Sequence, residues 1–223
     1  MAAAFTGRDV PQRASDEYIR ATFDHFAGNF EKQLQRLEYK APELVATATA
    51  DTLGTPRGEL DVLDAGCGTG WCGPSARPYA RRLTGVDLSP AMVDRARSRQ
   101  IYDDLIVAEL TEYLRNCHDS FDLIVSADTL VYFGDLQEVF VAAARSLRPG
   151  GVLIFTAERA GSDHPADSGF RLQHHGRYCH TEEYIRATLH KAGLAVRCVA
   201  GVVLRKEMDQ PVNGLLVTAI KGD

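Results

Sequence analysis

The feature that most constrains the fold is a short, mainly apolar run that ends in an acid and a glycine-rich turn. The run covers residues 60–63, Asp64 follows it, and glycines stand at positions 66, 68 and 70. Such a run is typical of a buried parallel strand, and alternating glycines indicate a turn whose backbone lies against a ligand. The sequence therefore predicts an α/β sheet with a ligand site at the end of its first strand.

The spacing of these glycines differs from that of a dinucleotide-binding turn, which has glycines at the first, third and sixth places. The sixth place here is Trp71, whose side chain would keep a helix from packing closely. The carboxylate of Asp64 would also repel a pyrophosphate. A nucleoside with an amino-acid tail fits the turn better, because an acid can accept its ammonium group.

Further stretches of the chain resemble a known family in their order and content. These stretches are LTGVDLSPAMVDRAR (83–97), FDLIVSADTLVYF (121–133) and LRPGGVLIF (147–155). Together with VLDAGCGTG (62–70), they resemble the motifs of the class I S-adenosylmethionine-dependent methyltransferases. The front FDHFAGNFEKQLQRLEYKAPEL (23–44) and the tail HGRYCHTEEYIRATLHKAGL (175–194) are similar to a bacterial small-molecule subgroup, some of whose members are fused to helical repeats. Trp71 departs from the leucine expected there.

The resemblance implies a doubly wound, mostly parallel sheet of seven strands, the last of them antiparallel, with an N-terminal helical lid. Apolar periodicity predicts strands over 60–63, 83–86, 105–108, 121–126, 152–156, 196–204 and 215–220. Helices are expected over 15–37 with a break at Gly28, over 42–53, 70–80 and 136–147, and from Ser89-Pro90 and Thr181 onward. Asn213-Gly214 is expected in the last turn.

The predicted domain organisation has two parts. Residues 1–57 form an N-terminal helical lid segment, and residues 58–223 form the S-adenosylmethionine-binding domain with an inserted loop at 158–180. The loop is expected because this stretch is rich in histidine and glycine and poor in aliphatic residues. The aromatic face of the first helix is equally consistent with ordinary core packing.

Acidic residues follow four of the predicted strands, at the edge where ligands bind in sheets of this kind. An acid some 17–20 residues after the glycines, here Asp87, can bind both ribose hydroxyls. One or two of these acids could instead be helix caps, Asp128 above all. The resemblance implies S-adenosylmethionine as the cofactor, bound by Asp64, Gly66, Cys67, Gly68, Gly70, Asp87, Leu88, Met92, Glu109, Leu110 and Asp128.

A general base is needed only if the nucleophile arrives protonated. The candidates are His174, His175, Tyr132 and Tyr178, with His180 beside them, although each residue type is more often a surface or packing residue. Phe26, Phe30 and Tyr39 are the candidate substrate-binding residues. No metal is expected, since no acid or cysteine completes a zinc-binding spacing with the histidines.

The expected function is transfer of a methyl group from S-adenosylmethionine to a small-molecule nucleophile, which makes the protein an enzyme. One alternative keeps the cofactor but attacks a different carbon, by ring closure or aminopropyl transfer, and releases methylthioadenosine. Another is a module that binds the cofactor without turnover.

Composition limits the partners. A net charge of −5 argues against nucleic acid, and no apolar run approaches the ~20 residues of a membrane span. Five scattered cysteines indicate reduced thiols and a cytoplasmic location. A small-molecule substrate is the expected partner, and the oligomeric state is left open.

Overall fold

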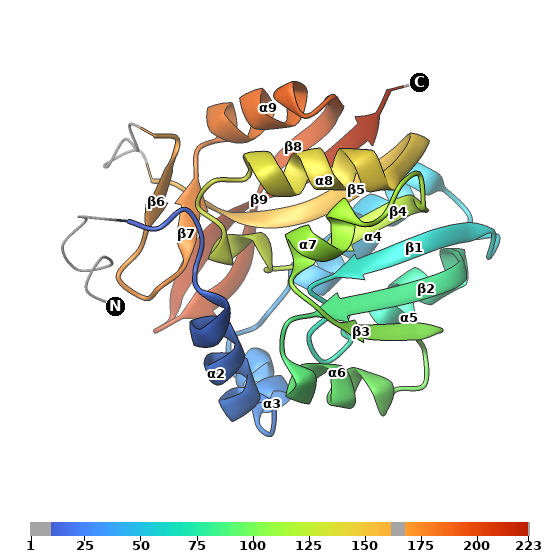
Figure 1. The fold of residues 1–223 in the computed structure, drawn as a ribbon. Helices are drawn as coiled ribbons and strands as arrows, with labels where there is room; N and C mark the ends of the chain where they lie inside the picture. Colours follow the sequence, from blue (N-terminus) through green and yellow to red (C-terminus); the bar gives the residue numbers. More distant parts are fainter. Residues whose placement is uncertain (1–9, 162–167, 223) are drawn as a thin grey trace.

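The computed structural model describes residues 10–161 and 168–222, and its centre is a twisted, mostly parallel sheet (Figure 1). Seven strands of that sheet lie in the order β3-β2-β1-β4-β5-β9-β8. They are β1 (Leu60–Ala65), β2 (Ala80–Asp87), β3 (Asp104–Val107), β4 (Phe121–Ser126), β5 (Leu147–Arg159), β8 (Leu194–Glu207) and β9 (Gln210–Lys221). Strand β9 is antiparallel to both of its neighbours, and the other neighbouring pairs are parallel. The predicted fold class is confirmed.

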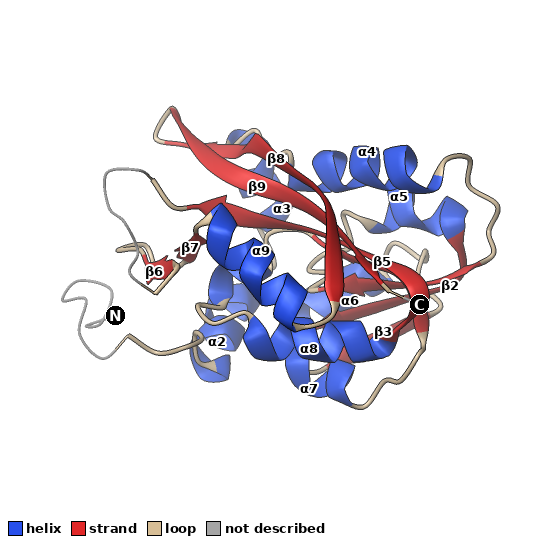
Figure 2. Ribbon diagram, turned by 90° about the horizontal axis from the view of Figure 1, so that it is seen from above, coloured by secondary structure: helices blue, strands red, loops and turns tan. Residues whose placement is uncertain are grey.

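Helices cover both faces of the sheet, as Figure 2 shows. Side chains of α4 and α5 pack on one face, and those of α7, α8 and α9 pack on the other. The helices are α2 (Asp16–Phe26), α3 (Phe30–Arg36), α4 (Ala41–Leu53), α5 (Gly73–Ala76), α6 (Pro90–Arg97), α7 (Leu110–Arg115), α8 (Gln137–Ser146) and α9 (Glu182–Lys191), with 3-10 turns η1 (Arg77–Tyr79) and η2 (Leu130–Tyr132).

Three helices begin where a serine or threonine predicted them. The side chains of Ser15, Ser89 and Thr181 each accept a hydrogen bond from the backbone N–H three residues further on. Such a cap satisfies one of the free N–H groups at the start of a helix. The cap at Ser89 matters for function, because it places the first turn of α6 beside the end of β2.

The helix predicted over 70–80 is wrong in length. Residues 70–72 belong to the glycine turn, and only the short α5 and the 3-10 turn η1 follow before β2 begins at Ala80. Pro78 explains the shortening, since proline has no N–H to continue the hydrogen-bond pattern of an α-helix. The glycine turn therefore leads into a compact connection rather than a long helix.

The segment over 158–180 contains strands instead of one continuous loop. Strands β6 (Phe170–Leu172) and β7 (Tyr178–His180) form an antiparallel pair, and β7 runs parallel to the end of β5. Every residue of β7 is buried. This hairpin is therefore part of the packed structure, while residues 162–167 lie outside the described residues.

The last turn also differs from the expectation. Strands β8 and β9 are joined at Met208 and Asp209, both of which have positive φ. Asn213-Gly214 lies inside β9 instead. A Cβ atom on Gly214 would approach the side chain of Leu204 to 2.5 Å, so this glycine makes room for Leu204 rather than forming a turn.

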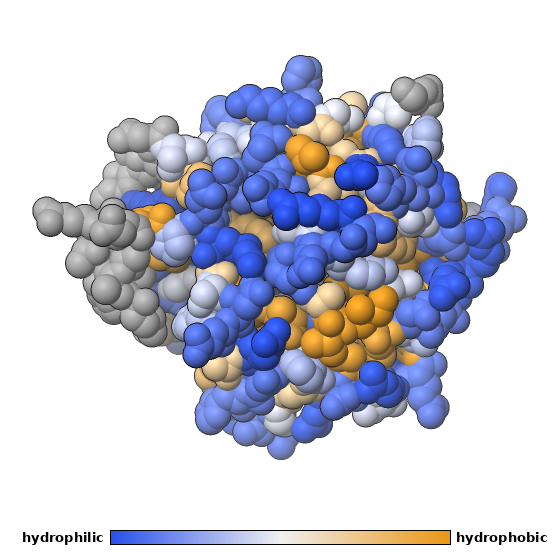
Figure 3. All heavy atoms as spheres, in the orientation of Figure 1, coloured by the Kyte–Doolittle hydropathy of each residue, from blue (hydrophilic) through white to orange (hydrophobic). Residues whose placement is uncertain are grey.

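The surface view of Figure 3 shows apolar side chains gathered over the edge strand β3, where Val107 is 46% exposed. Across the ranges described here, every helix is too short or too polar to cross a membrane. The division of the chain into residues 1–57 and 58–223 stays a prediction, and residues 1–9 lie outside the described ranges.

Candidate functional site

A cavity of about 400 Å³ opens at the carboxyl ends of β1, β2 and β4 and is roofed by α2 and α3. Its volume is in the range typical of sites for cofactors and small molecules. The four predicted acids all line it: Asp64, Asp87, Glu109 and Asp128. The sheet therefore brings together side chains that are up to 64 positions apart in the sequence (64 to 128).

Asp87 joins the end of β2 to the glycine turn. Its Oδ2 accepts a hydrogen bond from the backbone N–H of Gly68, and its Oδ1 accepts one from Ser89, both at 2.9 Å. Burial raises the pKa of this carboxyl above its ordinary value, and the backbone donors oppose that rise. Each oxygen keeps a second lone pair with which it can accept a hydrogen bond from a ligand hydroxyl.

Asp64 is the most deeply buried of the four acids, with 1% of its surface exposed. Its Oδ2 accepts a hydrogen bond of 2.6 Å from the hydroxyl of Tyr102. Burial raises the pKa of Asp64 to about 7. A cationic ligand group beside it would favour the ionised carboxylate, because opposite charges stabilise each other at short range.

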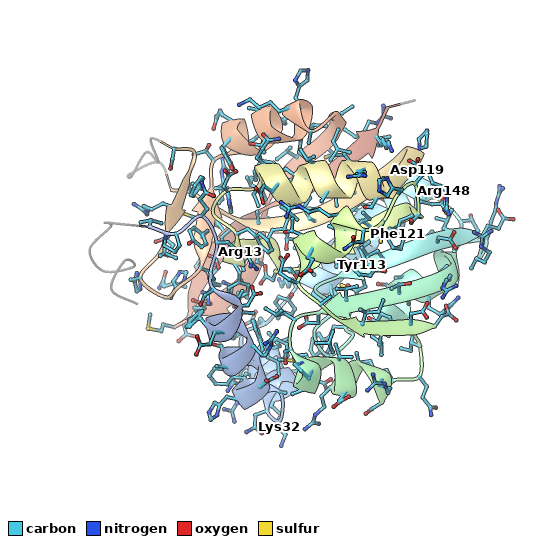
Figure 4. All side chains as sticks on the ribbon, viewed as in Figure 1. Arg13, Lys32, Tyr113, Asp119, Phe121 and Arg148 are labelled. Atoms are coloured by element: carbon cyan, nitrogen blue, oxygen red, sulfur yellow. The ribbon has the colours of Figure 1, made fainter. Side chains whose placement is uncertain are left out.

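Glu109 combines two structural contacts with its place in the cavity wall. Its Oε2 caps α7 by accepting from the N–H of Glu112 at 2.8 Å, and its Oε1 accepts from Arg13 at 3.2 Å. The guanidinium of Arg13 also lies 5.6 Å from the ring centre of Phe133. Figure 4 labels Arg13 on the segment that leads into α2. A helix cap is thus found at Glu109 and not at Asp128, where it was expected above all.

Asp128 belongs to an ionic cluster that the sequence did not reveal. We define this cluster as Asp128, Glu158, Glu207, Arg177 and Arg205. Arg205 donates to Asp128 at 2.6 Å, to Glu207 at 2.8 Å and to Glu158, while Arg177 donates to Glu158 and to Glu207 at 2.6 Å each. Burial raises the pKa of Asp128 and the charge of Arg205 opposes the rise.

The predicted glycines have different environments. A Cβ atom on Gly66 would lie 2.0 Å from Oγ1 of Thr129, so Gly66 allows close packing of the turn. Gly68 has a φ of +52°, and a Cβ atom there would meet nothing within 4 Å, so it would project into open space at the cavity wall. Gly70 does not line the cavity, because Arg99 and Tyr102 lie against it.

The remaining predicted cofactor residues lie at the cavity wall: Cys67, Leu88, Met92 and Leu110. Burial raises the pKa of the Cys67 thiol well above its ordinary value, which keeps it protonated and unreactive. Met92 is 1% exposed and lies in the first turn of α6, so it is both a packing residue and part of the wall.

Aromatic residues form much of the roof and one side of the cavity. Phe26, Phe30 and Tyr39 line it as predicted. Phe23 contacts Phe30 and Tyr132 edge to face, with ring centres 5.9 and 5.4 Å apart. These contacts connect α2 and α3 to the end of β4 across the cavity.

Two polar atoms at the wall point to a ligand that the sequence alone could not indicate. In the described part of the chain, Oγ1 of Thr69 and Nε1 of Trp71 are buried without a hydrogen-bond partner. Buried polar groups in native proteins almost always have a partner, so an unpaired one in a cavity indicates a missing ligand. The indole of Trp71 lies 6.2 Å from the ring of Tyr39.

The structure separates the candidate bases. Tyr132 and His175 line the cavity, but His174 and Tyr178 do not. Tyr178 is fully buried and donates to the carbonyl oxygen of Pro11 at 2.7 Å. His180 is buried against the carbonyl oxygen of Gly134, and burial lowers its pKa to about 4.

His175 lies beside the ionic cluster, with its Nε2 3.8 Å from Oε2 of Glu158. Burial is the main cause that lowers the pKa of His175. Among residues 10–161 and 168–222, no group of three or more His, Cys, Asp or Glu side chains is placed to hold a metal ion. All five cysteines are free thiols.

Comparison with known proteins agrees with this geometry. A family profile described as a methyltransferase domain matches residues 63–155. The malonyl-[acyl-carrier protein] O-methyltransferase of Salmonella typhimurium is 32% identical over 150 residues, which cover 67% of this chain and 57% of that protein. Nodulation protein S of Rhizobium tropici is 33% identical over 105 residues, 44% of this chain and 43% of that protein. The chain thus spans about half the length of these relatives.

Solved structures share the fold. An S-adenosylmethionine-dependent methyltransferase from Mesorhizobium loti is 26% identical with a TM-score of 0.58, covering 78% of this chain and 96% of that one. Magnesium protoporphyrin IX methyltransferase from Synechocystis is 18% identical with a TM-score of 0.66, covering 93% and 100%. In its matched domain and in its fold, the chain is thus similar to the class I S-adenosylmethionine-dependent methyltransferases.

Proposed function

We propose that the chain transfers a methyl group from S-adenosylmethionine to a small-molecule nucleophile. The observation that carries this proposal is the cavity at the strand ends, with the buried Asp64 and three partly buried acids on its floor and aromatic side chains on its roof. The acids of such a cavity can balance the positive charge of a cationic nucleoside and accept hydrogen bonds from its hydroxyls. The aromatic roof can exclude water from the bound nucleoside.

The residues of the cavity fit this cofactor. The carboxylate of Asp64 would accept its ammonium group, and Asp87 would accept its ribose hydroxyls. The open space at Gly68 would admit the ligand against bare backbone. The unpaired donors of Thr69 and Trp71 provide further polar contacts for its amino-acid tail.

The adenine would lie among apolar side chains. Leu88, Met92 and Leu110 line the cavity near the ends of β2 and β3 and would contact the two faces of the base. Cys67, Gly66 and Glu109 complete the wall on this side. Asp128 is paired with Arg205 in the ionic cluster, so its place in cofactor binding stays a prediction.

When bound, the cofactor supplies a sulfonium-linked methyl group that a nucleophile can take by in-line displacement. The protein's part is to hold the acceptor in line and keep water out, and such positioning supplies several kcal/mol of the rate enhancement. Phe26, Phe30 and Tyr39 would contact the acceptor, since they line the cavity under the helices that roof it.

His175 is the better of the two candidate bases at the cavity wall. Its lowered pKa leaves the imidazole neutral at pH 7, so it can accept a proton, and Glu158 would stabilise the resulting cation. Burial raises the pKa of Tyr132, so its hydroxyl stays protonated at neutral pH and cannot serve as a general base.

The acceptors of the related proteins differ, and they bear on this chain only as possibilities. One relative is a malonyl-[acyl-carrier protein] O-methyltransferase, and structural neighbours include a magnesium protoporphyrin IX methyltransferase and a phosphoethanolamine N-methyltransferase. We propose a small-molecule acceptor, free or attached to a carrier. A cytoplasmic location without a nucleic-acid partner stays a prediction from charge and cysteine content.

Product analysis tests the function. The purified chain is incubated with S-adenosylmethionine and fractions of cell extract, and the nucleoside product is identified by mass. Methyl transfer leaves S-adenosylhomocysteine, whereas ring closure or aminopropyl transfer leaves methylthioadenosine. Binding in calorimetry without either product over a broad acceptor panel would favour a non-catalytic module.

A further inference from the structure

Tyr102 lies outside the cavity wall but contacts one of its acids. It is partly buried in the connection between α6 and β3, and its hydroxyl donates to Oδ2 of Asp64 at 2.6 Å. This is the one side-chain hydrogen bond that the Asp64 carboxylate accepts within the described residues. Oδ1 of Asp64 is left without a hydrogen-bond donor from these residues.

Three glycines from separate parts of the fold make room for this tyrosine. A Cβ atom would lie 3.0 Å from Cε2 of Tyr102 if placed on Gly70, 2.9 Å from its Oη on Gly73, and 3.0 Å from its Cδ1 on Gly85. Contacts this short force neighbouring atoms to shift. The backbone of the glycine turn, of α5 and of β2 therefore leaves the space that the phenol ring occupies, with Arg99 also beside Gly70 and Leu105 also beside Gly85.

The hydroxyl of Tyr102 stays protonated over the whole physiological pH range. Burial and the nearby Asp64 charge raise the pKa of Tyr102 far above its ordinary value, so the hydroxyl remains a donor. The bond from Tyr102 in turn lowers the pKa of Asp64 and so opposes the effect of burial. Tyr102 thus favours the ionised carboxylate in a buried position.

We propose that Tyr102 is a positioning residue that fixes one oxygen of Asp64 from behind the cavity and leaves the other oxygen for a cationic group of the ligand. This rests on the proposed function, in which that group is the ammonium of the cofactor's amino-acid tail. Tyr102 touches no ligand itself and acts through Asp64.

The test compares two ligands that differ in the amino-acid tail. S-adenosylhomocysteine carries the ammonium, and methylthioadenosine lacks the whole tail. Tyr102→Phe keeps the ring among its glycines and removes only the hydroxyl. We expect it to weaken S-adenosylhomocysteine binding up to roughly 10-fold at pH 7, because a rise of about one unit in the pKa of Asp64 would leave that carboxyl mostly protonated, and to leave methylthioadenosine binding unchanged.

The pH dependence gives a second readout. Without the hydrogen bond, Asp64 holds its proton to higher pH, so the affinity for S-adenosylhomocysteine should recover at a higher pH in Tyr102→Phe than in the wild type. Tyr79→Phe is the matched control, because Tyr79 is also buried and donates one hydrogen bond, to Gly54 at 3.0 Å, away from the cavity. Both affinities should be unchanged in this control.

A double variant shows whether the effect runs through Asp64. We expect Asp64→Asn to weaken S-adenosylhomocysteine binding, and Tyr102→Phe to add nothing in that background. Additive losses, an equal loss for both ligands, or no loss at all would overturn the role of Tyr102. Failure of the wild type to bind either ligand would instead refute the proposed function, so the two failures are distinguishable.

Discussion

Asp87, at the end of β2, accepts a hydrogen bond from the backbone N–H of Gly68 at 2.9 Å. Strand β2 is thereby bonded directly to the glycine turn that follows β1. A second hydrogen bond, from Ser89, ties the same carboxylate to the start of α6. Asp87, which is expected to bind the ribose, therefore also holds the backbone of the cavity wall in place.

Asp87→Ala should weaken cofactor binding and also lower stability. Loss of hydrogen bonds to a charged group should reduce affinity by roughly 10- to 150-fold, and the two unpaired N–H groups should cost about 1–3 kcal/mol each where they stay buried. Calorimetry with S-adenosylhomocysteine measures the first effect, and urea unfolding measures the second.

Asp103→Ala is the control for this variant. Asp103 also accepts a backbone hydrogen bond, from Leu83 at 2.7 Å, but lies beside the middle of β2 and does not line the cavity. It should lose stability with no change in affinity. Equal affinity losses in both variants would show that Asp87 acts only on the fold.

Gly68→Ala should greatly reduce cofactor binding while the protein stays folded. The added methyl group would stand in open space at the cavity wall, and the left-handed backbone would cost about 1–2 kcal/mol. Gly150→Ala carries the same kind of strain, at φ +74° and also with nothing within 4 Å, but is remote from the cavity. Thermal shifts on adding S-adenosylhomocysteine should vanish in the first variant and persist in the second.

His175→Gln should lower the rate of methyl transfer by about 10²- to 10⁴-fold, the usual contribution of a general base. Because burial places the pKa of His175 below its ordinary value of 6.5, the wild-type rate should be constant above that pH and fall as the pH drops through the pKa. In His175→Gln, the residual rate should not fall in this way as the pH is lowered. His174→Gln, an adjacent imidazole outside the cavity wall, should behave like the wild type.

Asp24→Ala should loosen the roof of the cavity. Oδ1 of Asp24 on α2 accepts from the hydroxyl of Ser89 at 2.5 Å and from the N–H of Ala91 at 3.4 Å, so it fastens α2 to the start of α6. We expect faster dissociation of S-adenosylhomocysteine in stopped-flow measurements. Glu17→Ala, at an exposed position of the same helix, should leave dissociation unchanged.

The strand ends and the glycine turn could be predicted because their signals are local. An apolar run, an acid and alternating glycines specify a buried strand followed by a turn, whatever the rest of the chain does. Ser89-Pro90 likewise combines a helix cap with a favoured first residue, and α6 begins there.

The wrong predictions concern parts of the fold that depend on contacts between residues far apart in the sequence. Asn213-Gly214 looks like a hairpin turn, but the packing of Leu204 uses that glycine, and the strands instead turn at Met208. The ionic cluster could not be predicted from local patterns. Arg205 lies on β8 and Asp128 follows β4, so the two side chains meet only in the folded sheet, where β9 lies between β5 and β8. The β6–β7 hairpin could not be predicted either, because Tyr178-Cys179-His180 is buried at every position and so carries no alternating pattern.

Hydrogen exchange of the wild-type chain with and without S-adenosylhomocysteine tests directly whether the cofactor binds in this cavity. We expect added protection in residues 64–70 and 87–92, where the cofactor would lie, and in residues 22–30, where α2 and α3 cover it. The β6–β7 hairpin should be strongly protected in both states, because it is already packed. Unchanged exchange at residues 64–70 and 87–92 would contradict the site proposed here.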